Sequence, residues 1–335
     1  MSSLNGYDLV KSVGLRSYPR VYFELVFVGF TVSMGMSLAS SFLPILAHDL
    51  DPSGVLVGLV VSAWFLSRLF IELPAGVISD RIGRRKLLIT GVGLSALGAF
   101  LCSQAKSIYV LTLGRGIWGL GTGLYFMNNT ALIFDLFDPK MRGHALGMFD
   151  GIEFIGGFIG APLGAFLAGF MSYTSVFYFT LALVAFSLAL VLNSRGLRAV
   201  GGNKGGREEG VNSVVRRTLA GLRNSSVMVI CLVTFFRMLV MTGIFSAVLE
   251  LYLNKELLLS LTYIGLVLSL RTAGHIVAAL ISGFLSDRFS RRSIAMGGFL
   301  VNAGCLAVFS FAYRLELFLA AVSYTHLRAH ETGRN

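Results

Sequence analysis

The chain is short of charge. Only 13% of its 335 residues are Asp, Glu, Lys or Arg, whereas 55% are hydrophobic and the mean hydropathy is +0.76. Soluble globular domains carry about 25% charged residues, which cover the surface that meets water. A shortage of this size excludes an ordinary soluble fold and predicts that most of the surface faces lipid.

Cysteine and histidine are also scarce. Cys102, Cys231 and Cys305 all lie within apolar runs and lack the spacing of metal ligands, so we expect buried thiols rather than a metal centre. At membrane depth the predicted spans contain one histidine, His275. An intramembrane enzyme would gather His, Asp and Glu there. We therefore expect no metal, no cofactor and no enzymatic activity.

Long apolar runs are what the sequence has instead. A helix needs about 20 apolar residues to cross a bilayer. Nine segments read as full spans, apolar all round with scattered Gly and Ala, and a tenth begins at Leu315 and stops near Val322. The predicted fold is all-α and polytopic, with spans at 21–47, 54–78, 87–104, 107–134, 144–168, 173–193, 226–253, 260–285 and 294–313.

A charged segment between two of these spans occurs twice. Gly76–Lys86 reads GVISDRIGRRK and returns at Gly283–Arg292 as GFLSDRFSRR, so that Asp287 follows Asp80 by 207 positions. A self-match at a fixed offset, placed each time between apolar runs, is the mark of a duplicated unit. We interpret the segment as a short charged loop and predict two homologous halves.

The repeat divides the chain into domains. We predict an N-terminal segment at 1–20, a six-helix bundle at 21–193, a basic linker at 194–225 and an incomplete second bundle at 226–322. Residues 323–335 have no apolar period and no counterpart of the Arg115 stretch expected at that offset. We expect the chain to be truncated near residue 322 with a non-native tail; a natural short protein is the alternative.

A net charge of +11 is compatible with binding to nucleic acid, but the position of the charged residues in the sequence argues against it. The connections after the second, fourth, sixth and eighth spans, and the N-terminal segment, are rich in Lys and Arg. The alternate connections hold only Lys106, Lys255 and Arg314. This alternation places the N-terminus and the linker in the cytoplasm of a cell that carries the protein in its plasma membrane. The positive charge then serves topology and lipid headgroups, without a nucleic-acid partner.

Several charged side chains lie inside the predicted spans. Each costs about 2.5–3.5 kcal/mol at mid-membrane and must face a partner or a water-filled cavity. Arg68 and Glu72 are four residues apart and can pair, either as a neutralised structural pair or in substrate or proton handling. Arg271 and His275 have no carboxylate neighbour in sequence, so their partner must come from another helix or the substrate. The remaining candidates are Arg115, Arg237, Asp150, Glu153 and Asn128.

Asp150 and Glu153 are three residues apart in the fifth span. Each raises the proton affinity of the other, and a carboxylate that binds and releases a proton can drive a proton-coupled carrier. We favour Glu153, the deeper of the two; a fixed salt bridge with Arg115 or Arg237 is the alternative.

Glycines mark the predicted helix crossings. Gly156, Gly160 and Gly164 are spaced by four and make a smooth face for a close crossing, bent near Pro162. Gly119 and Gly121 serve the fourth span in the same way. Gly114–Gly119 also fits a dinucleotide-binding pattern, but it lies in an apolar run with no preceding strand, so we expect no nucleotide.

These motifs resemble those of one transporter family. The repeated segment resembles the loop signature of the major facilitator superfamily, and Arg115–Gly121 resembles its fourth-helix signature. Arg142–Gly164 is similar to the fifth-helix pattern associated with antiporters, except that Ala161 precedes Pro162 and Ala165 replaces the last glycine.

The resemblance implies a fold, a function and a set of roles. The fold is two six-helix bundles that rock around a central cavity, and Arg115 is linked to proton transfer. We expect a monomeric secondary transporter that exports a small drug-like or metabolite substrate in exchange for protons. A proton-coupled importer of a sugar or organic acid, or an inactive fragment, is the alternative. The implied gate residues are Gly76, Asp80, Arg81, Gly83 and Arg84, and in the second half Asp287, Arg288 and Arg291.

Overall fold

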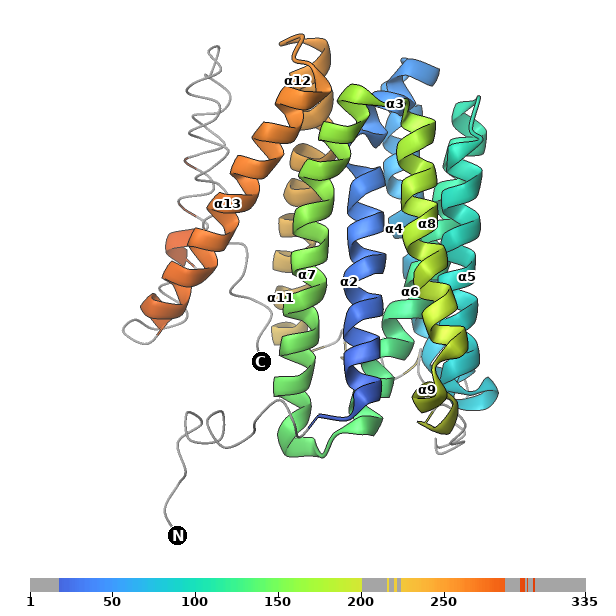
Figure 1. Ribbon diagram of the computed structural model, residues 1–335. Helices are drawn as coiled ribbons and strands as arrows, with labels where there is room; N and C mark the ends of the chain where they lie inside the picture. The colour runs from blue at the N-terminus through green and yellow to red at the C-terminus, as the bar shows by residue number, and fades with distance from the viewer. Residues whose placement is uncertain are drawn as a thin grey trace.

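The computed structural model describes residues 18–200, 216, 220–221, 224–286, 296–298, 300 and 304. Over these residues the chain is helical and contains no strand, which confirms the all-α prediction. Figure 1 shows the long helices side by side, running alternately up and down. Most of the predicted span 294–313, the tail at 323–335 and most of the linker lie outside the described residues.

The first half makes six passes. Its helices are α2 (Arg20–Ser40), α3 (Leu43–Leu50), α4 (Gly54–Ile82), α5 (Arg84–Ser103), α6 (Ile108–Leu136), α7 (Pro139–Phe170), α8 (Tyr173–Asn193) and the short α9 (Arg195–Val200). The predicted first span is broken in two, because Pro44 has no N–H to continue α2 and instead occupies the first turn of α3. The start of the predicted linker is also helical, since Ser194 Oγ accepts a hydrogen bond from the backbone N–H of Leu197 (3.0 Å) at the head of α9.

The second half is described over two passes. The first consists of α11 (Ser225–Met238), the π-helix η2 (Leu239–Val248) and α12 (Leu249–Lys255), and the second is α13 (Leu261–Ser286). The predicted span 226–253 is thus one continuous helical run with a widened middle. π-helical turns are rare and frequently occur at functional sites.

The repeated charged segment is not a loop. α4 continues to Ile82 and α5 begins at Arg84, so that Gly83 alone separates the two helices. Gly83 has φ 99° and ψ 136°, a backbone conformation that L-residues rarely adopt. Gly76 stays within α4, and Gly83 is the glycine that takes this conformation and reverses the chain. The loop prediction is wrong in this respect.

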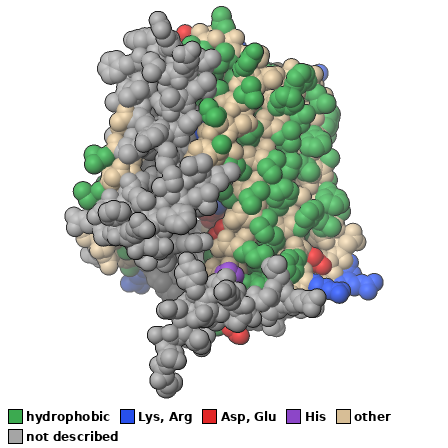
Figure 2. Space-filling model, turned by 60° about the vertical axis from the view of Figure 1, so that its left-hand side comes forward, with side chains coloured by type: hydrophobic (Ala, Val, Ile, Leu, Met, Phe, Trp, Pro, Cys, Tyr) green, Lys and Arg blue, Asp and Glu red, His purple; other side chains and the backbone are tan. Residues whose placement is uncertain are grey.

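The exterior is apolar. Among the described residues, five helices are long and apolar enough to cross a membrane: Arg20–Ser40, Gly54–Glu72, Arg84–Ser103, Met141–Phe170 and Tyr173–Asn193. Figure 2 shows hydrophobic side chains spread over one face, with Lys and Arg mainly at its lower edge. Large side chains such as Phe70 and Phe170 are 74% and 68% exposed. A surface of this kind is unfavourable in water and suits hydrocarbon.

Glycines bring helices of the first half into backbone contact. A Cβ added to Gly156, Gly160 or Gly164 of α7 would stand well under 3.0 Å from a carbonyl oxygen of α2, at Phe30, Met34 and Leu38 respectively. Both sets are spaced by four, so two matching stripes lie against each other. In the same way Gly119 of α6 meets Trp64 of α4, and Gly121 meets Ser95 of α5. Pro162 lies inside α7.

The two halves touch at one end of the molecule. We call the end where α3 and α12 lie the α3 end, and the opposite end the α9 end (Figure 1). At the α3 end, α13 crosses α7 where Gly265 lies against Pro162, and Lys255 Nζ lies 2.6 Å from Asp49 Oδ1. Towards the α9 end, α13 leans away from α7. α4 and α13 both run from the α3 end towards the α9 end, where they finish at Ile82 and Ser286 (Figure 1).

Candidate functional site: a cavity between the two halves

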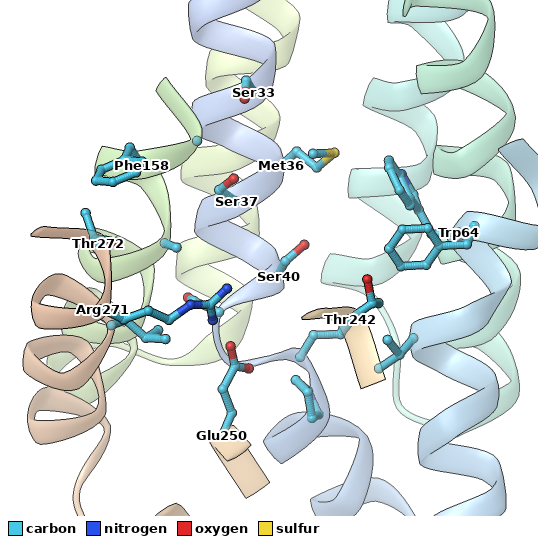
Figure 3. Close-up of a pocket in the computed structure, with 18 of the residues that line it drawn as sticks. Ser33, Met36, Ser37, Ser40, Trp64, Phe158, Thr242, Glu250, Arg271 and Thr272 are labelled. Carbon is cyan, nitrogen blue, oxygen red and sulfur yellow. The ribbon is translucent and has the colours of Figure 1, made fainter. Parts of the chain in front are cut away.

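A cavity of about 470 Å³ lies between the halves, in the interior below the α3 end. Its walls come from α2, α3, α4, α6 and α7 of the first half and from η2, α12 and α13 of the second (Figure 3). Its apolar lining is largely aromatic and comes from both sides of the cavity, with Trp64 on one side and Phe158 on the other (Figure 3); the apolar residues are Met36, Val61, Trp64, Phe65, Phe154, Phe158 and Leu268. Large apolar surfaces with a few polar groups are typical of ligand sites.

Glu250 and Arg271 supply opposite charges to this cavity. Glu250, on α12, is only 4% exposed, and its Oε2 atom is buried with no hydrogen-bond partner among the described residues. Figure 3 shows its carboxylate and the Arg271 guanidinium of α13 pointing towards the same region. The two charges interact electrostatically. The sequence leaves the partner of Arg271 open between another helix and the substrate, and Glu250 of α12 is a carboxylate on another helix that interacts with it.

Glu250 is absent from the candidates named above, although the sequence carries a signal for it. It lies inside the predicted span 226–253, where the cost of burying a charge applies to it as to the other intramembrane residues. Its position close to the end of that span makes it look like an interfacial residue. In the structure Glu250 lies on α12, directly after η2, and lines the cavity.

Hydroxyl groups line another part of the cavity. Ser33, Ser37, Ser40 and Ser41 follow α2 and its end, and Thr242 comes from η2 (Figure 3). Ser41 Oγ donates to the carbonyl oxygen of Leu38 (2.8 Å), a bond that leaves the oxygen lone pairs available as acceptors. This wall offers neutral donors and acceptors.

Arg115 lines the cavity from α6. It is 4% exposed, and its Nε and Nη1 atoms have no hydrogen-bond partner in the described part of the chain. The guanidinium carbon lies 6.0 Å from the ring centroid of Trp64 and 5.7 Å from that of Trp118. Cation–π attraction to these rings offsets part of the cost of burying the charge.

A second group of charges lies deeper in the first half. Arg68 and Glu72 form the predicted i,i+4 ion pair, and the Arg68 guanidinium also lies 4.4 Å from the ring centroid of Phe126. Glu153 is 9% exposed and is influenced by the charges of Asp150 and Arg68. Over the described residues Glu153 makes no ion pair with Arg115; a pair with Arg237, the other partner in that alternative, is not tested. The side chains of Arg237 and His275 lie outside the described residues.

Asn128 does not take part in the cavity. It is fully buried, accepts a hydrogen bond from Ser79 Oγ of α4 and donates through Nδ2 to the carbonyl oxygen of Leu124 (2.7 Å). Its amide therefore ties α6 to α4. Burial of an amide in a helix bundle requires such partners.

The repeated segment places Arg84 between two carboxylates. Arg84 Nε lies 2.5 Å from Asp135 Oδ2 at the end of α6, and Arg84 Nη2 lies 3.7 Å from Asp80 Oδ1. Asp135 is not among the sequence-based candidates. Arg81 is exposed, and Gly76 has open space where a Cβ would stand. The second copy, with Asp287, Arg288 and Arg291, falls outside the described residues.

Comparison with known proteins adds to this geometry. The quinolone resistance protein NorA of Staphylococcus aureus (strain Mu50 / ATCC 700699) is 30% identical over 172 residues, covering 51% of this chain and 44% of NorA. The MFS-type efflux pump MMF1 of Pseudozyma antarctica (strain T-34) is 28% identical over 175 residues, covering 51% of this chain and 32% of MMF1. The matched region spans less than half the length of either relative.

Solved transporters share the fold. The crystal structure of a D-xylose-proton symporter superposes with a TM-score of 0.67 at 16% identity, covering 92% of this chain and 79% of the symporter. A bacterial homologue of the human lysosomal transporter Spinster, solved inward-facing and unoccupied, gives 0.66 at 15% identity, covering 92% and 72%. The family model of the Major Facilitator Superfamily matches residues 25–239 and 230–324. The chain therefore belongs to the major facilitator superfamily of membrane transporters.

Proposed function

We propose that this transporter exports a small drug-like or metabolite molecule in exchange for protons. The observation that carries the proposal is the cavity between the two halves, which combines an aromatic wall with the opposite charges of Glu250 and Arg271. Such a site suits an amphiphilic solute better than an inorganic ion or a fully polar one. Two similar proteins are named for efflux or drug resistance, which favours the outward direction.

The arrangement of the halves supports entry from the cytoplasm. Lys255 and Asp49 join them at the α3 end, and α13 leans away from α7 towards the α9 end (Figure 1). Positively charged connections gather at the α9 end, which is the cytoplasmic end by the positive-inside rule. A cytoplasmic solute would then reach the cavity before the halves rock to the other state.

Glu153 is the proposed proton carrier. It is buried in the first half beside Asp150, within the influence of Arg68, and Arg68 is in turn paired with Glu72. A proton taken up here would remove a negative charge from a cluster of three carboxyl groups and one guanidinium, without occupying the substrate cavity. Release of that proton on the other side of the membrane would restore the charge and complete the exchange.

A proton-coupled importer of a hydroxylated solute is the second candidate. The serines on the α2 wall, Ser33, Ser37, Ser40 and Ser41, favour it because hydroxyl groups recognise sugars and hydroxy acids. The two functions differ in the sign of the proton gradient that drives accumulation, so one assay separates them.

Proteoliposomes with an imposed pH gradient test the proposal. For exchange, an acidic lumen drives accumulation of a labelled amphiphile inside; for symport, an acidic exterior does so. We expect accumulation with the acidic lumen, and its loss when the gradient is collapsed. Flux that ignores the gradient would reject proton coupling.

The proton carrier is tested in the same vesicles. Glu153→Gln should abolish gradient-driven accumulation while substrate binding is retained. Glu256→Gln, at an exposed position in the connection after α12, is the matched control and should behave as wild type. Full coupled flux by Glu153→Gln would reject Glu153 as the carrier.

A further inference from the structure

We infer that the cavity selects zwitterionic amphiphiles, molecules that carry a protonated amine and a carboxylate on an aromatic or apolar body. This inference rests on the proposed function in one respect, that the cavity is the substrate site. It names the chemical class of the substrate from the charges in the wall.

The first observation is that one carboxylate oxygen of Glu250 lacks a hydrogen-bond donor among the described residues. Glu250 is buried at 4% exposure, faces the cavity, and its Oε2 atom has no hydrogen-bond partner among the described residues. A buried carboxylate oxygen in this state is unfavourable unless something in the cavity donates to it. An ammonium group is a strong donor to such an oxygen and matches its charge.

The second observation is the neighbouring guanidinium. Arg271 interacts electrostatically with Glu250, and Figure 3 shows both side chains directed into the same region. A guanidinium has five N–H donors in a planar fork and can bind two carboxylates at once. A substrate carboxylate can therefore bind Arg271 beside Glu250.

Charge balance separates the possible substrates. An amphiphilic cation would gain Glu250 but meet the positive charge of Arg271 in a cavity of low dielectric constant, where repulsion is strong. An anion would be attracted to Arg271 but repelled by Glu250. A zwitterion with its ammonium on Glu250 and its carboxylate on Arg271 satisfies both residues and leaves the net charge of the site unchanged.

The rest of the wall fits the remainder of such a molecule. Trp64, Phe65, Phe154 and Phe158 offer aromatic surface, and the volume of about 470 Å³ lies in the range of sites for drug-sized molecules. The serines of α2 line the cavity between Trp64 and Phe158 (Figure 3) and accommodate further polar substituents. The charged pair sets the head group, and the aromatic wall sets the body.

A four-member ligand series on one aromatic amino-acid scaffold tests the inference. The members are the zwitterion, its methyl ester (a cation), its N-acetyl derivative (an anion) and the doubly blocked neutral compound. Binding to the purified protein is measured by titration calorimetry in detergent. We expect the zwitterion to bind at least tenfold more tightly than each of the other three.

Variants assign each half of the head group. Glu250→Gln should weaken binding of the zwitterion and the ester about tenfold and strengthen binding of the N-acetyl compound, which is no longer repelled by Glu250. Arg271→Gln should weaken binding of the zwitterion and the N-acetyl compound and strengthen binding of the ester, which is no longer repelled by Arg271. Glu256→Gln is the control, and Glu250→Asp, which keeps the charge, should retain the preference for the zwitterion even if its stability falls.

Each contrary result overturns the inference. Equal affinity of the ester and the zwitterion would make the site a cation site, and equal affinity of the N-acetyl compound would make it an anion site. Uniform weakening of all four ligands by Glu250→Gln would give Glu250 a purely structural role. Binding of none of the series would exclude the substrate class. Transport measured in parallel keeps the two proposals apart: proton-driven flux of all four at equal rates retains export, and tight zwitterion binding without proton-driven flux retains the substrate class.

Discussion

Gly164 of α7 lies so close to Leu38 of α2 that a Cβ atom on the glycine would overlap the leucine carbonyl oxygen. Because the obstacle is backbone, it cannot move aside as a flexible side chain would. We expect Gly164→Ala to destabilise the protein by about 1–3 kcal/mol, the usual cost of overpacking. The thermal unfolding midpoint in detergent measures it.

A glycine in the same helix provides the control for that prediction. Gly151 of α7 has nothing within 4 Å of the position of an added Cβ. Gly151→Ala should leave the midpoint unchanged or raise it slightly, since alanine favours a helix by up to about 1 kcal/mol over glycine. Equal loss of stability in both variants would show that the contact with Leu38 is not the cause.

The bridge between Arg84 and Asp135 should matter more for transport than for stability. The Arg84 and Asp135 side chains are 20% and 41% exposed, and a partly exposed ion pair contributes about 1 kcal/mol or less. We expect Asp135→Asn to leave the unfolding midpoint nearly unchanged and to slow transport several-fold, because the bridge holds α5 to α6 at the α9 end.

Asp138, exposed at the start of α7, is the matched control for Asp135. Asp138→Asn removes a charge from the same end of the molecule without touching Arg84, so its transport rate should remain that of wild type. Comparable slowing in both variants would point to general surface charge and not to the bridge.

The pair of Asp49 and Lys255 should bias the equilibrium between the two states. The pair joins the halves at the α3 end, with side chains 40% and 36% exposed, and Tyr173 OH also donates to Asp49 Oδ2 at 3.4 Å. We expect Asp49→Lys to weaken closure of this end by about 1 kcal/mol, which shifts the populations roughly fivefold. Labelling of a cysteine introduced into the cavity wall, with a reagent applied from outside, reports the shift.

Exchanging the two charges tests whether they act as a pair. The double variant Asp49→Lys/Lys255→Asp should restore the labelling rate of wild type, whereas the single variants should not. Additive effects in the double variant would mean that the residues act independently.

Ser194 should stabilise the end of the first half through two contacts. Its hydroxyl donates to Glu24 of α2 and accepts from the backbone N–H of Leu197, which starts α9. We expect Ser194→Ala to lower the free energy of unfolding by about 1 kcal/mol, the usual effect of losing a helix cap. Ser62→Ala, which removes a hydroxyl bonded to carbonyl groups of its own helix, should have a smaller effect. Chemical denaturation in detergent compares the two.

The sequence predicts the passes through the membrane well, because the cost of placing polar side chains in hydrocarbon restricts composition over whole helices. It predicts their ends less well. The break before α3 and the one-residue turn at Gly83 depend on backbone choices at single residues, and a charged stretch next to glycine reads equally as loop or as helix end. The π-helix η2 leaves no pattern in the sequence at all.

The same holds for the site residues: pairs within one helix are predictable from the sequence, and pairs between helices are not. Arg68 and Glu72 are predictable as a pair because one helix fixes their spacing. Glu250 and Arg271 lie on different helices, as do Arg84 and Asp135, and only packing brings each pair together. Asn128 shows the opposite error, since a polar residue inside a span reads as a cavity residue until its hydrogen bond to Ser79 is seen.

The contact of α13 with α7 lies near one end of a long helix. α13 has 26 residues and so measures about 39 Å, while Gly265, where it meets Pro162, is the fifth of them. A tilt of about 10° around that crossing would carry the far tip through roughly 6 Å, at 1.5 Å per residue. The residues at the crossing, Gly265 and Pro162, would hardly shift. Leverage of this kind would let a change of an ångström beside Pro162 open or shut a passage wide enough for an organic molecule.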